Sequence, residues 1–299
     1  MNMIGSIFFY WDPNPTAFTI PLIGRPIAWY GILFALGFFI GFYFLMSLFI
    51  RYARERTDWS EEMLKKKGRL FSERLTVYVI ISTVVGARLG HVLFYEKLSH
   101  YLAHPLDIVK TWEGGLASHG GVIGILIGIT LFYFRSRKEF PFLSIRRIVD
   151  LMVVPSLFVG ALIRVGNFIN QEVLGTASSL PWAVVFGHPI DGSPPIPRHP
   201  AQLYEALCYF GMFVLLWRLF PRLVGKAGRL SGLLFISIFT FRFFIEFVKE
   251  EQSHLMGHQL LTMGQWLSIP MILLGVFFMK RFGKEQEEEV DPKVSQGSR

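Results

Sequence analysis

Seven apolar segments, each close to the length of a membrane-spanning helix, restrict what this chain can fold into. They cover residues 28–50, 75–95, 117–134, 148–169, 200–217, 230–249 and 262–279. A helix of about 20 apolar residues crosses the hydrocarbon core of a bilayer, whereas apolar runs in soluble domains are shorter. Only 17% of the 299 residues are charged, compared with about 25% in soluble domains. We therefore predict an all-α integral membrane protein with seven transmembrane helices.

The basic residues are unevenly distributed between the two sides of these segments. Of the 30 Lys and Arg residues, 22 follow the first, third, fifth or seventh segment, and five lie on the opposite side. Because loops rich in Lys and Arg remain in the cytoplasm, the N-terminus is predicted outside and the C-terminus in the cytoplasm. The formal net charge of +8 is therefore an orientation signal, and we expect no nucleic-acid partner.

Residues 1–283 are predicted to form a single membrane domain. Within it, residues 170–199 are rich in Gly, Pro and Ser and longer than a turn requires, which predicts a small external cap. Residues 284–299 are predicted to be a disordered cytoplasmic tail, because they contain too few apolar residues to bury.

Cysteine and histidine usage predicts neither a disulfide nor a metal site. Cys208 is the single cysteine and lies in an apolar segment, so it can form no intrachain disulfide and is a poor nucleophile. His91, His188 and His199 lack the spacing to a Cys or to acidic residues that a zinc site requires.

Three arginines, Arg88, Arg164 and Arg242, fall inside the predicted helices. A charged side chain at the centre of a bilayer costs at least about 2.5–3.5 kcal/mol, so each arginine needs a partner or a task. With the N-terminus outside, all three lie in the outer half of the membrane. The same depth is predicted for Tyr30, His119, Tyr204 and Glu205. The sequence therefore predicts a polar cavity that opens toward the outer leaflet.

Two of these arginines have candidate acidic partners. Arg242 and Glu246 are four residues apart and can pair within one helix. Arg88 can pair with Glu113 or Glu246. A structural salt bridge is therefore an open alternative to a functional role for both arginines.

The other polar groups also have two interpretations. Arg164 has no acidic residue within one helical turn, and Asn167 and Gln171 share its helix face, so we predict an unpaired arginine with a function. His119 is either a helix-start residue bonded to backbone or a catalytic group that titrates near neutral pH. Tyr30 is either an interfacial anchor or part of the cavity.

Glycines recur at four-residue spacing beside two of these groups. Gly86 and Gly90 flank Arg88, and Gly120, Gly124 and Gly128 follow His119. This spacing lets neighbouring helices approach closely enough to supply partners for the buried charges.

The segment GALIRVGNFINQEVLG at 160–175 resembles the signature of the bacterial prolipoprotein diacylglyceryl transferases. Further matches occur in the order typical of the family and cover nearly the whole chain. They are WYG at 29–31, GARLGHVLFY at 86–95, WEGGLASHGG at 112–121, PRHPAQLYE at 197–205 and FRFFIEFVKE at 241–250.

This resemblance implies a multi-pass enzyme of the bacterial cytoplasmic (inner) membrane with its active site toward the outer leaflet. The family transfers the diacylglyceryl group of phosphatidylglycerol to the lipobox cysteine in the signal peptide of a prolipoprotein. The reaction releases glycerol phosphate, is the first step of lipoprotein maturation, and uses no metal or organic cofactor. The expected partners are therefore phosphatidylglycerol, the prolipoprotein signal peptide and other membrane lipids.

The resemblance also implies the site residues. His119, Arg164 and Arg242 are expected to be catalytic. Substrate binding is expected at Arg164, Tyr30, Asn167, Glu172, Gly175 and Glu246, and we add Arg88 as the residue that closes the charge network. The chain has Ala28, Gln171, Leu174 and Ile238 where relatives often have His, Gly, Trp and Tyr, so any role of those side chains is absent here.

The chemistry of this reaction suggests different roles for the arginines and for His119. A phosphate held between Arg164 and Arg242 would leave as a thiolate attacks the lipid glycerol carbon. His119 is either the base for the thiol or a hydrogen-bond donor. A lipid or anion transporter is the competing class, but the chain has no internal repeats and few polar residues in the inner half of its segments. For a membrane phosphatase, the sequence offers no His/Asp nucleophile set.

Overall fold

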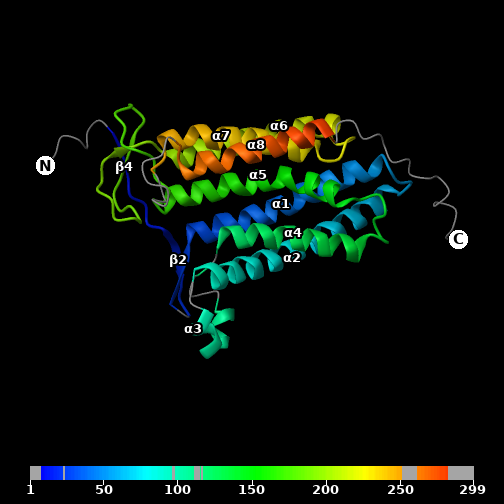
Figure 1. Ribbon diagram of the computed structural model, residues 1–299, viewed down its shortest axis with the longest axis horizontal. Helices are drawn as coiled ribbons and strands as arrows, with labels where there is room; N and C mark the ends of the chain where they lie inside the picture. Colours follow the sequence, from blue (N-terminus) through cyan, green and yellow to red (C-terminus); the bar gives the residue numbers. More distant parts are fainter. Residues whose placement is uncertain are drawn as a thin grey trace. The chain divides into compact units, whose positions relative to one another are not determined.

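A computed structural model describes residues 8–22, 24–95, 98–110, 115, 117–250 and 261–281. It contains seven helices that are long and apolar enough to cross a membrane, as predicted. They are α1 (Trp29–Arg54), α2 (Glu61–Phe94), α4 (Ser118–Ser136), α5 (Ile145–Ile169), α6 (Ala201–Leu223), α7 (Arg229–Ile245) and α8 (Met263–Arg281) (Figure 1). The predicted tail at 284–299 lies outside the described residues, and the orientation of the termini stays a prediction.

Short helical turns connect some of these helices. α3 (Leu98–Ala103) and η2 (Pro105–Val109) lie between α2 and α4, and η4 (Glu246–Val248) follows α7. Each is too short to cross a bilayer.

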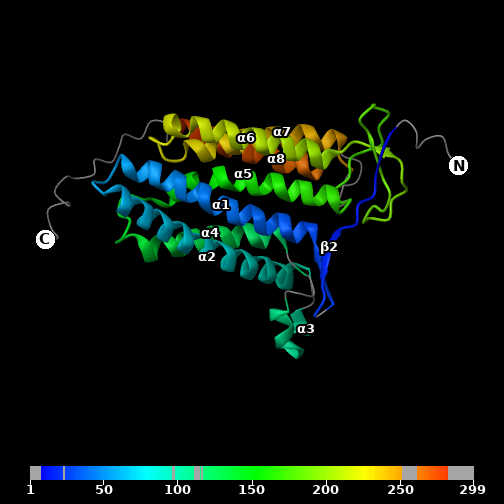
Figure 2. The same ribbon diagram turned by 180° about the vertical axis from the view of Figure 1, so that it is seen from behind.

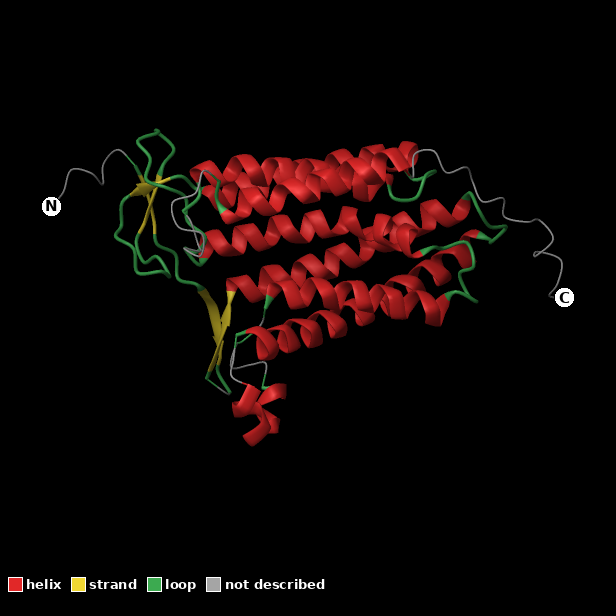
Figure 3. Cartoon of the chain, viewed as in Figure 1, coloured by secondary structure: helices red, strands yellow, loops and turns green. Residues whose placement is uncertain are grey.

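Among the described residues there are also five short strands, which an all-α prediction omits. β1 (Phe9–Trp11) pairs in parallel with β4 (Val184–Phe186), and β4 pairs antiparallel with β5 (Pro197–Arg198). β2 (Thr16–Ile20) and β3 (Arg25–Ala28) form an antiparallel hairpin that leads into α1 (Figure 3). These strands are rich in β-branched and aromatic residues. They are too short for their alternation to stand out beside the long apolar helices.

The segment predicted to be a cap, residues 170–199, is folded around a small core of its own. Phe168, Leu174, Val184 and Phe186 are buried together, and Trp11 from β1 packs against them. The Trp11 indole also donates to the Phe168 carbonyl oxygen at 3.0 Å. The N-terminal strand and residues 170–199 therefore form one structure at the end of α5.

The described residues divide into two compact units. One contains the chain up to Phe44 and from Met152 onward, and the other runs from Leu45 to Leu151. In the first unit, α6, α7 and α8 lie side by side in both views (Figures 1 and 2). The single membrane domain over residues 1–283 stays a prediction.

In the second unit, α2 and α4 are in direct backbone contact through glycines. A Cβ atom added to Gly90 would lie 2.8 Å from the Cα atom of Gly120, and one added to Gly86 would lie 2.8 Å from the Cα atom of Gly124. The predicted close approach of helices at these glycines is therefore confirmed, and the two glycine series face each other.

Replacing Gly86 by leucine is expected to lower the thermal unfolding midpoint, because overpacking a tight contact costs about 1–3 kcal/mol or more. Gly211→Leu on α6 is the matched control, since a Cβ atom there meets nothing within 4 Å. Thermal unfolding in detergent measures both variants. Equal midpoints would show that the α2–α4 contact tolerates side chains.

Candidate functional site

A buried carboxylate joins two cations in the first unit. Arg164 near the end of α5 places its Nε atom 3.1 Å from Glu205 Oε2, on the second turn of α6. Lys249, just after η4, places its Nζ atom 3.4 Å from Glu205 Oε1. Glu205 is 1% exposed. The expectation that Arg164 is unpaired is therefore wrong, because its acidic partner comes from another helix.

A second ion pair belongs to the same electrostatic group. Arg242 Nη2 lies 3.5 Å from Glu246 Oε1, which confirms the predicted pair at four-residue spacing. Lys249 interacts electrostatically with both of these residues as well as with Glu205 and Arg164. These five side chains therefore bring three cations against two carboxylates, which favours an anionic ligand.

Amide side chains connect this group to the end of α5. Arg164 Nη1 donates to Asn167 Oδ1 at 3.1 Å, and Asn167 Nδ2 donates to Glu172 Oε1 at 2.7 Å. Asn170 Nδ2 donates to the same Glu172 oxygen at 3.3 Å. Gln202 of α6 donates to the Glu172 carbonyl oxygen at 2.8 Å. Side chains of the signature segment at 160–175 therefore form a hydrogen-bonded series from the Arg164 guanidinium, through Asn167, to the Glu172 carboxylate.

Gln171 does not share this face, contrary to prediction. α5 ends at Ile169, and Gln171 has a φ of 53°, in the left-handed region that turns the chain away. Val173 has a φ of 60°, so two strained residues flank Glu172. Gln171 instead donates to Asp12 Oδ1 at 3.0 Å and accepts from the His188 backbone N–H at 2.8 Å.

Tyr30 and Gly175 also belong to this unit. A Cβ atom on Gly166 would lie 2.7 Å from the Tyr30 ring, so this glycine makes room for the tyrosine. Glu172 and Arg164 both act electrostatically on the Tyr30 hydroxyl. Gly175 forms a β-bridge with Lys249, which places the lysine beside the site.

Arg88 and His119 lie in the second unit. Arg88 is buried and donates to the backbone carbonyl oxygens of Ile108 at 2.9 Å, Gly115 at 3.1 Å and Asp107 at 2.6 Å. It thereby holds the segment that connects α2 with α4. Its candidate partner Glu113 lies outside the described residues.

The ring of His119 is exposed on the first turn of α4. Its centroid lies 5.3 Å from that of Phe94 and 5.7 Å from that of Tyr95, both at the end of α2. The meeting of His119 and Arg88 with Arg164 and Arg242 in one cavity stays a prediction.

Sequence reasoning missed several members of the site. Glu205 was predicted to share the depth of the arginines but was given no role, and Lys249 was counted only among the five basic residues on the side opposite the cytoplasmic loops. Tyr209, whose ring centroid lies 5.9 Å from the Arg164 guanidinium carbon, was not singled out. One signal was available, because Tyr209 follows Glu205 by four residues and shares its helix face.

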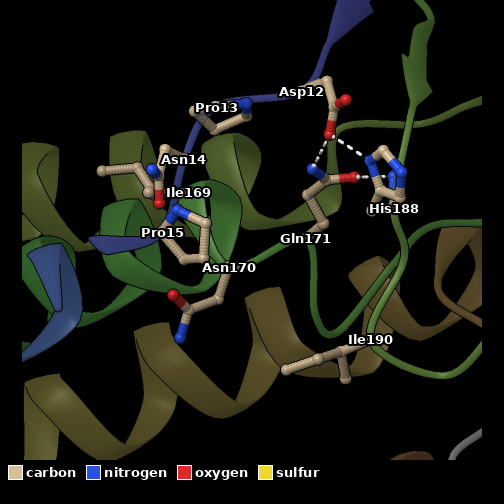
Figure 4. A pocket seen from close by; sticks show the side chains of 9 residues that line it. All are labelled: Asp12, Pro13, Asn14, Pro15, Ile169, Asn170, Gln171, His188 and Ile190. Carbon is tan, nitrogen blue, oxygen red and sulfur yellow. Dashed lines mark hydrogen bonds and ion pairs between the residues drawn. The ribbon is translucent and has the colours of Figure 1, made fainter. Parts of the chain in front are cut away.

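A pocket of about 490 Å³ opens beside the end of α5 (Figure 4). Its lining is Asp12, Pro13, Asn14, Pro15, Ile169, Asn170, Gln171, His188 and Ile190. His188 Nδ1 lies 2.7 Å from Asp12 Oδ1, and Gln171 bonds to both residues. Asn170 links the pocket to Glu172 and hence to the Arg164 network.

Acid is expected to loosen this pocket. The hydrogen bond from His188, and then that from Gln171, lowers the pKa of Asp12. The folded state therefore favours the ionised carboxylate, and its stabilisation is present above the ordinary carboxyl pKa and is lost as the pH falls through the lowered pKa. Hydrogen-exchange protection of the His188 amide should follow that loss and should be low at every pH in Asp12→Asn. Equal protection in both proteins at neutral pH would contradict this assignment.

Comparisons with known proteins identify the family of the chain. The family model described as prolipoprotein diacylglyceryl transferase matches residues 15–281. A relative from Tolumonas auensis, described as a phosphatidylglycerol–prolipoprotein diacylglyceryl transferase, is 41% identical over 93% of this chain and 98% of its own length. Relatives with the same description from Chlamydia trachomatis and Protochlamydia amoebophila are 41% and 33% identical over 89% and 92% of this chain, and 96% and 95% of their own lengths. The chain belongs to the prolipoprotein diacylglyceryl transferase family.

Proposed function

We propose that this membrane enzyme transfers the diacylglyceryl group of phosphatidylglycerol to the thiol of a prolipoprotein lipobox cysteine. The thiol sulfur forms a bond to the lipid glycerol carbon, and the bond from that carbon to the phosphate oxygen breaks. The bonding electrons leave with the phosphate as glycerol phosphate, and the thiol proton passes to a base. The product is a thioether, and no oxidant or reductant is needed.

The observation that carries this proposal is that two cations, Arg164 and Lys249, meet at the single buried carboxylate of Glu205. A phosphodiester has one negative charge, and the departing phosphate monoester gains a second. Positive groups that are fixed before the reaction stabilise such a developing charge without having to reorganise. Arg164 is fixed in this way, because its Nε atom forms an ion pair with Glu205 and its Nη1 atom donates a hydrogen bond to Asn167.

Arg164 and Arg242 hold the lipid phosphate in this proposal, and Lys249 adds a third positive charge. Both arginines are kept in place by carboxylates, Glu205 and Glu246. Charge-assisted hydrogen bonds from a guanidinium match a phosphate in geometry as well as in charge. Tyr30 and the Asn167–Glu172 pair border the site and orient the headgroup.

The site faces the outer leaflet of a bacterial inner membrane in this proposal. The support is the excess of Lys and Arg in the loops on the opposite side. The signal peptide would enter from the lipid, and the part of the prolipoprotein beyond its cysteine would lie along the pocket at Asp12 and His188.

The direct test supplies purified protein with phosphatidylglycerol vesicles and a lipobox peptide. We expect the peptide to gain the mass of one diacylglyceryl group on its cysteine, and a peptide with serine at that position to remain unmodified. Mass spectrometry distinguishes the two results. Movement of the lipid headgroup across the membrane without a modified peptide would favour the transporter instead.

His119 is the base in this proposal, since histidine titrates near the pH at which a thiol must lose its proton. We expect His119→Gln to lower kcat by about 100-fold or more. His91→Gln, on the neighbouring helix α2, is the control. A wild-type kcat in His119→Gln would remove His119 as the base.

A further inference from the structure

A second cluster of polar side chains lies in the segment between α2 and α4, apart from the groups that the proposed reaction uses. His100 is on α3, His104 directly precedes η2, and Asp107 lies within η2 (α3 is labelled in Figures 1 and 2). One potential metal-binding atom from each residue can be chosen so that all three lie within 4.8 Å of one another. Sequence reasoning weighed other histidines and did not consider these.

His100 contacts both of the other side chains. His100 Nε2 lies 3.2 Å from Asp107 Oδ2. The His100 and His104 rings are stacked, with centroids 5.2 Å apart and planes 29° apart. Two imidazoles and one carboxylate form a ligand set that suits zinc and related divalent transition metals.

The carboxylate of Asp107 has one oxygen available for this role. Lys110 Nζ bonds to Oδ1 at 2.6 Å, whereas Oδ2 is the oxygen that faces His100. A metal at Oδ2 would replace the contact with His100 and leave the lysine in place. Such outer hydrogen bonds to a ligating carboxylate are typical of metal sites, where they orient the ligand.

The backbone that carries the ligands is also held in position. The His104 amide donates to the His100 carbonyl at 2.9 Å, and the Asp107 amide donates to the His104 carbonyl at 3.0 Å. Arg88 donates to the carbonyl oxygens of Asp107 and Ile108. The ligands therefore lie on consecutive hydrogen-bonded turns that a buried arginine ties to α2.

We propose that His100, His104 and Asp107 bind one divalent transition-metal ion, with Zn²⁺ as the best match. Water would complete the tetrahedral coordination that Zn²⁺ prefers. The ion would fasten α3 to η2 and so rigidify the segment that Arg88 holds. This site does not depend on the proposed transfer reaction, because none of its ligands is assigned to catalysis.

The test uses the full chain in detergent, purified without a histidine tag and treated with a chelator. Titration with ZnCl₂ against a fluorescent zinc indicator should show one equivalent bound, with a dissociation constant below about 100 μM. His104→Ala and Asp107→Asn should each weaken binding at least about tenfold. Hydrogen exchange over residues 98–110 should slow on adding Zn²⁺ to the wild type and not to His104→Ala.

Two controls separate metal binding from other effects. His188→Ala removes an exposed histidine that also contacts a carboxylate, Asp12, but without a second imidazole, and it should keep the bound equivalent. Lys110→Gln removes the ion pair that Asp107→Asn also breaks, yet it keeps all three ligands and a side-chain N–H donor for Asp107, so it should weaken zinc binding less than Asp107→Asn does. The proposal would be overturned if the wild type showed no saturable zinc binding, or if His104→Ala bound zinc as tightly as the wild type.

Discussion

Replacing Arg164 by lysine is expected to reduce the rate of diacylglyceryl transfer by about 100- to 1,000-fold. Lysine keeps the charge but loses the planar fork that bonds simultaneously to Glu205, Asn167 and a phosphate. We expect the loss mainly in kcat, because the arginine acts most strongly on the charge that develops as the phosphate leaves. Rates of peptide lipidation at saturating phosphatidylglycerol measure it.

Arg147→Lys is the matched control for this substitution. Arg147 lies on the same helix, is also buried, and its Nη1 atom is 3.6 Å from Asp150 Oδ2. It belongs to the other unit and to no site described above. We expect its transfer rate, per folded protein, to stay within a few-fold of wild type. A wild-type kcat in Arg164→Lys would refute the proposed phosphate contact.

Neutralising Glu205 is expected to destabilise the fold as well as to abolish transfer. Glu205→Gln keeps the shape of the side chain but leaves the partly buried Arg164 and the buried Lys249 without their shared counter-charge. Removing one partner of a buried ion pair costs about 3–5 kcal/mol. The thermal unfolding midpoint in detergent and the transfer rate should therefore both fall.

A second substitution distinguishes lost charge balance from a local packing defect. Adding Lys249→Met to Glu205→Gln removes one of the two uncompensated cations, so it should recover part of the lost stability. Because the two residues are in contact, their effects on unfolding free energy should not be additive, with a coupling of about 0.5–3 kcal/mol. Strictly additive effects would contradict the electrostatic explanation.

The helices and the local polar pairs could be predicted from the sequence because their signals are local. Apolar runs of membrane-spanning length locate the seven helices. The spacing of Arg242 and Glu246 predicts their ion pair, since residues four apart share a helix face. Glycines at four-residue spacing likewise predict close approach of helices.

The partner of Arg164 could not be predicted in the same way. Glu205 is 41 residues away along the chain and reaches Arg164 only because α5 and α6 pack together. Lys249 reaches the same carboxylate through the β-bridge at Gly175, a tertiary contact with no periodic signal. The pairing of Gly86 and Gly90 with Gly120 and Gly124 is also tertiary, as the spacing does not identify the partner helix.

The turn after α5 places a residue other than glycine in a left-handed conformation. Gln171 has a φ of 53°, which glycine adopts without strain. The glutamine amide bonds to Asp12 and His188. These bonds offset the strained backbone and join the N-terminal segment to residues 170–199.

The strained residues on either side of Glu172 also affect the entropy cost of binding each lipid molecule. A side chain at Gln171 or Val173 restricts the conformations of the unfolded chain far more than glycine would. In the folded protein, the hydrogen bonds from Asn167 and Asn170 keep the Glu172 carboxylate in one orientation. The entropy lost in ordering this turn is therefore lost once, during folding, and does not reduce the affinity for each arriving lipid.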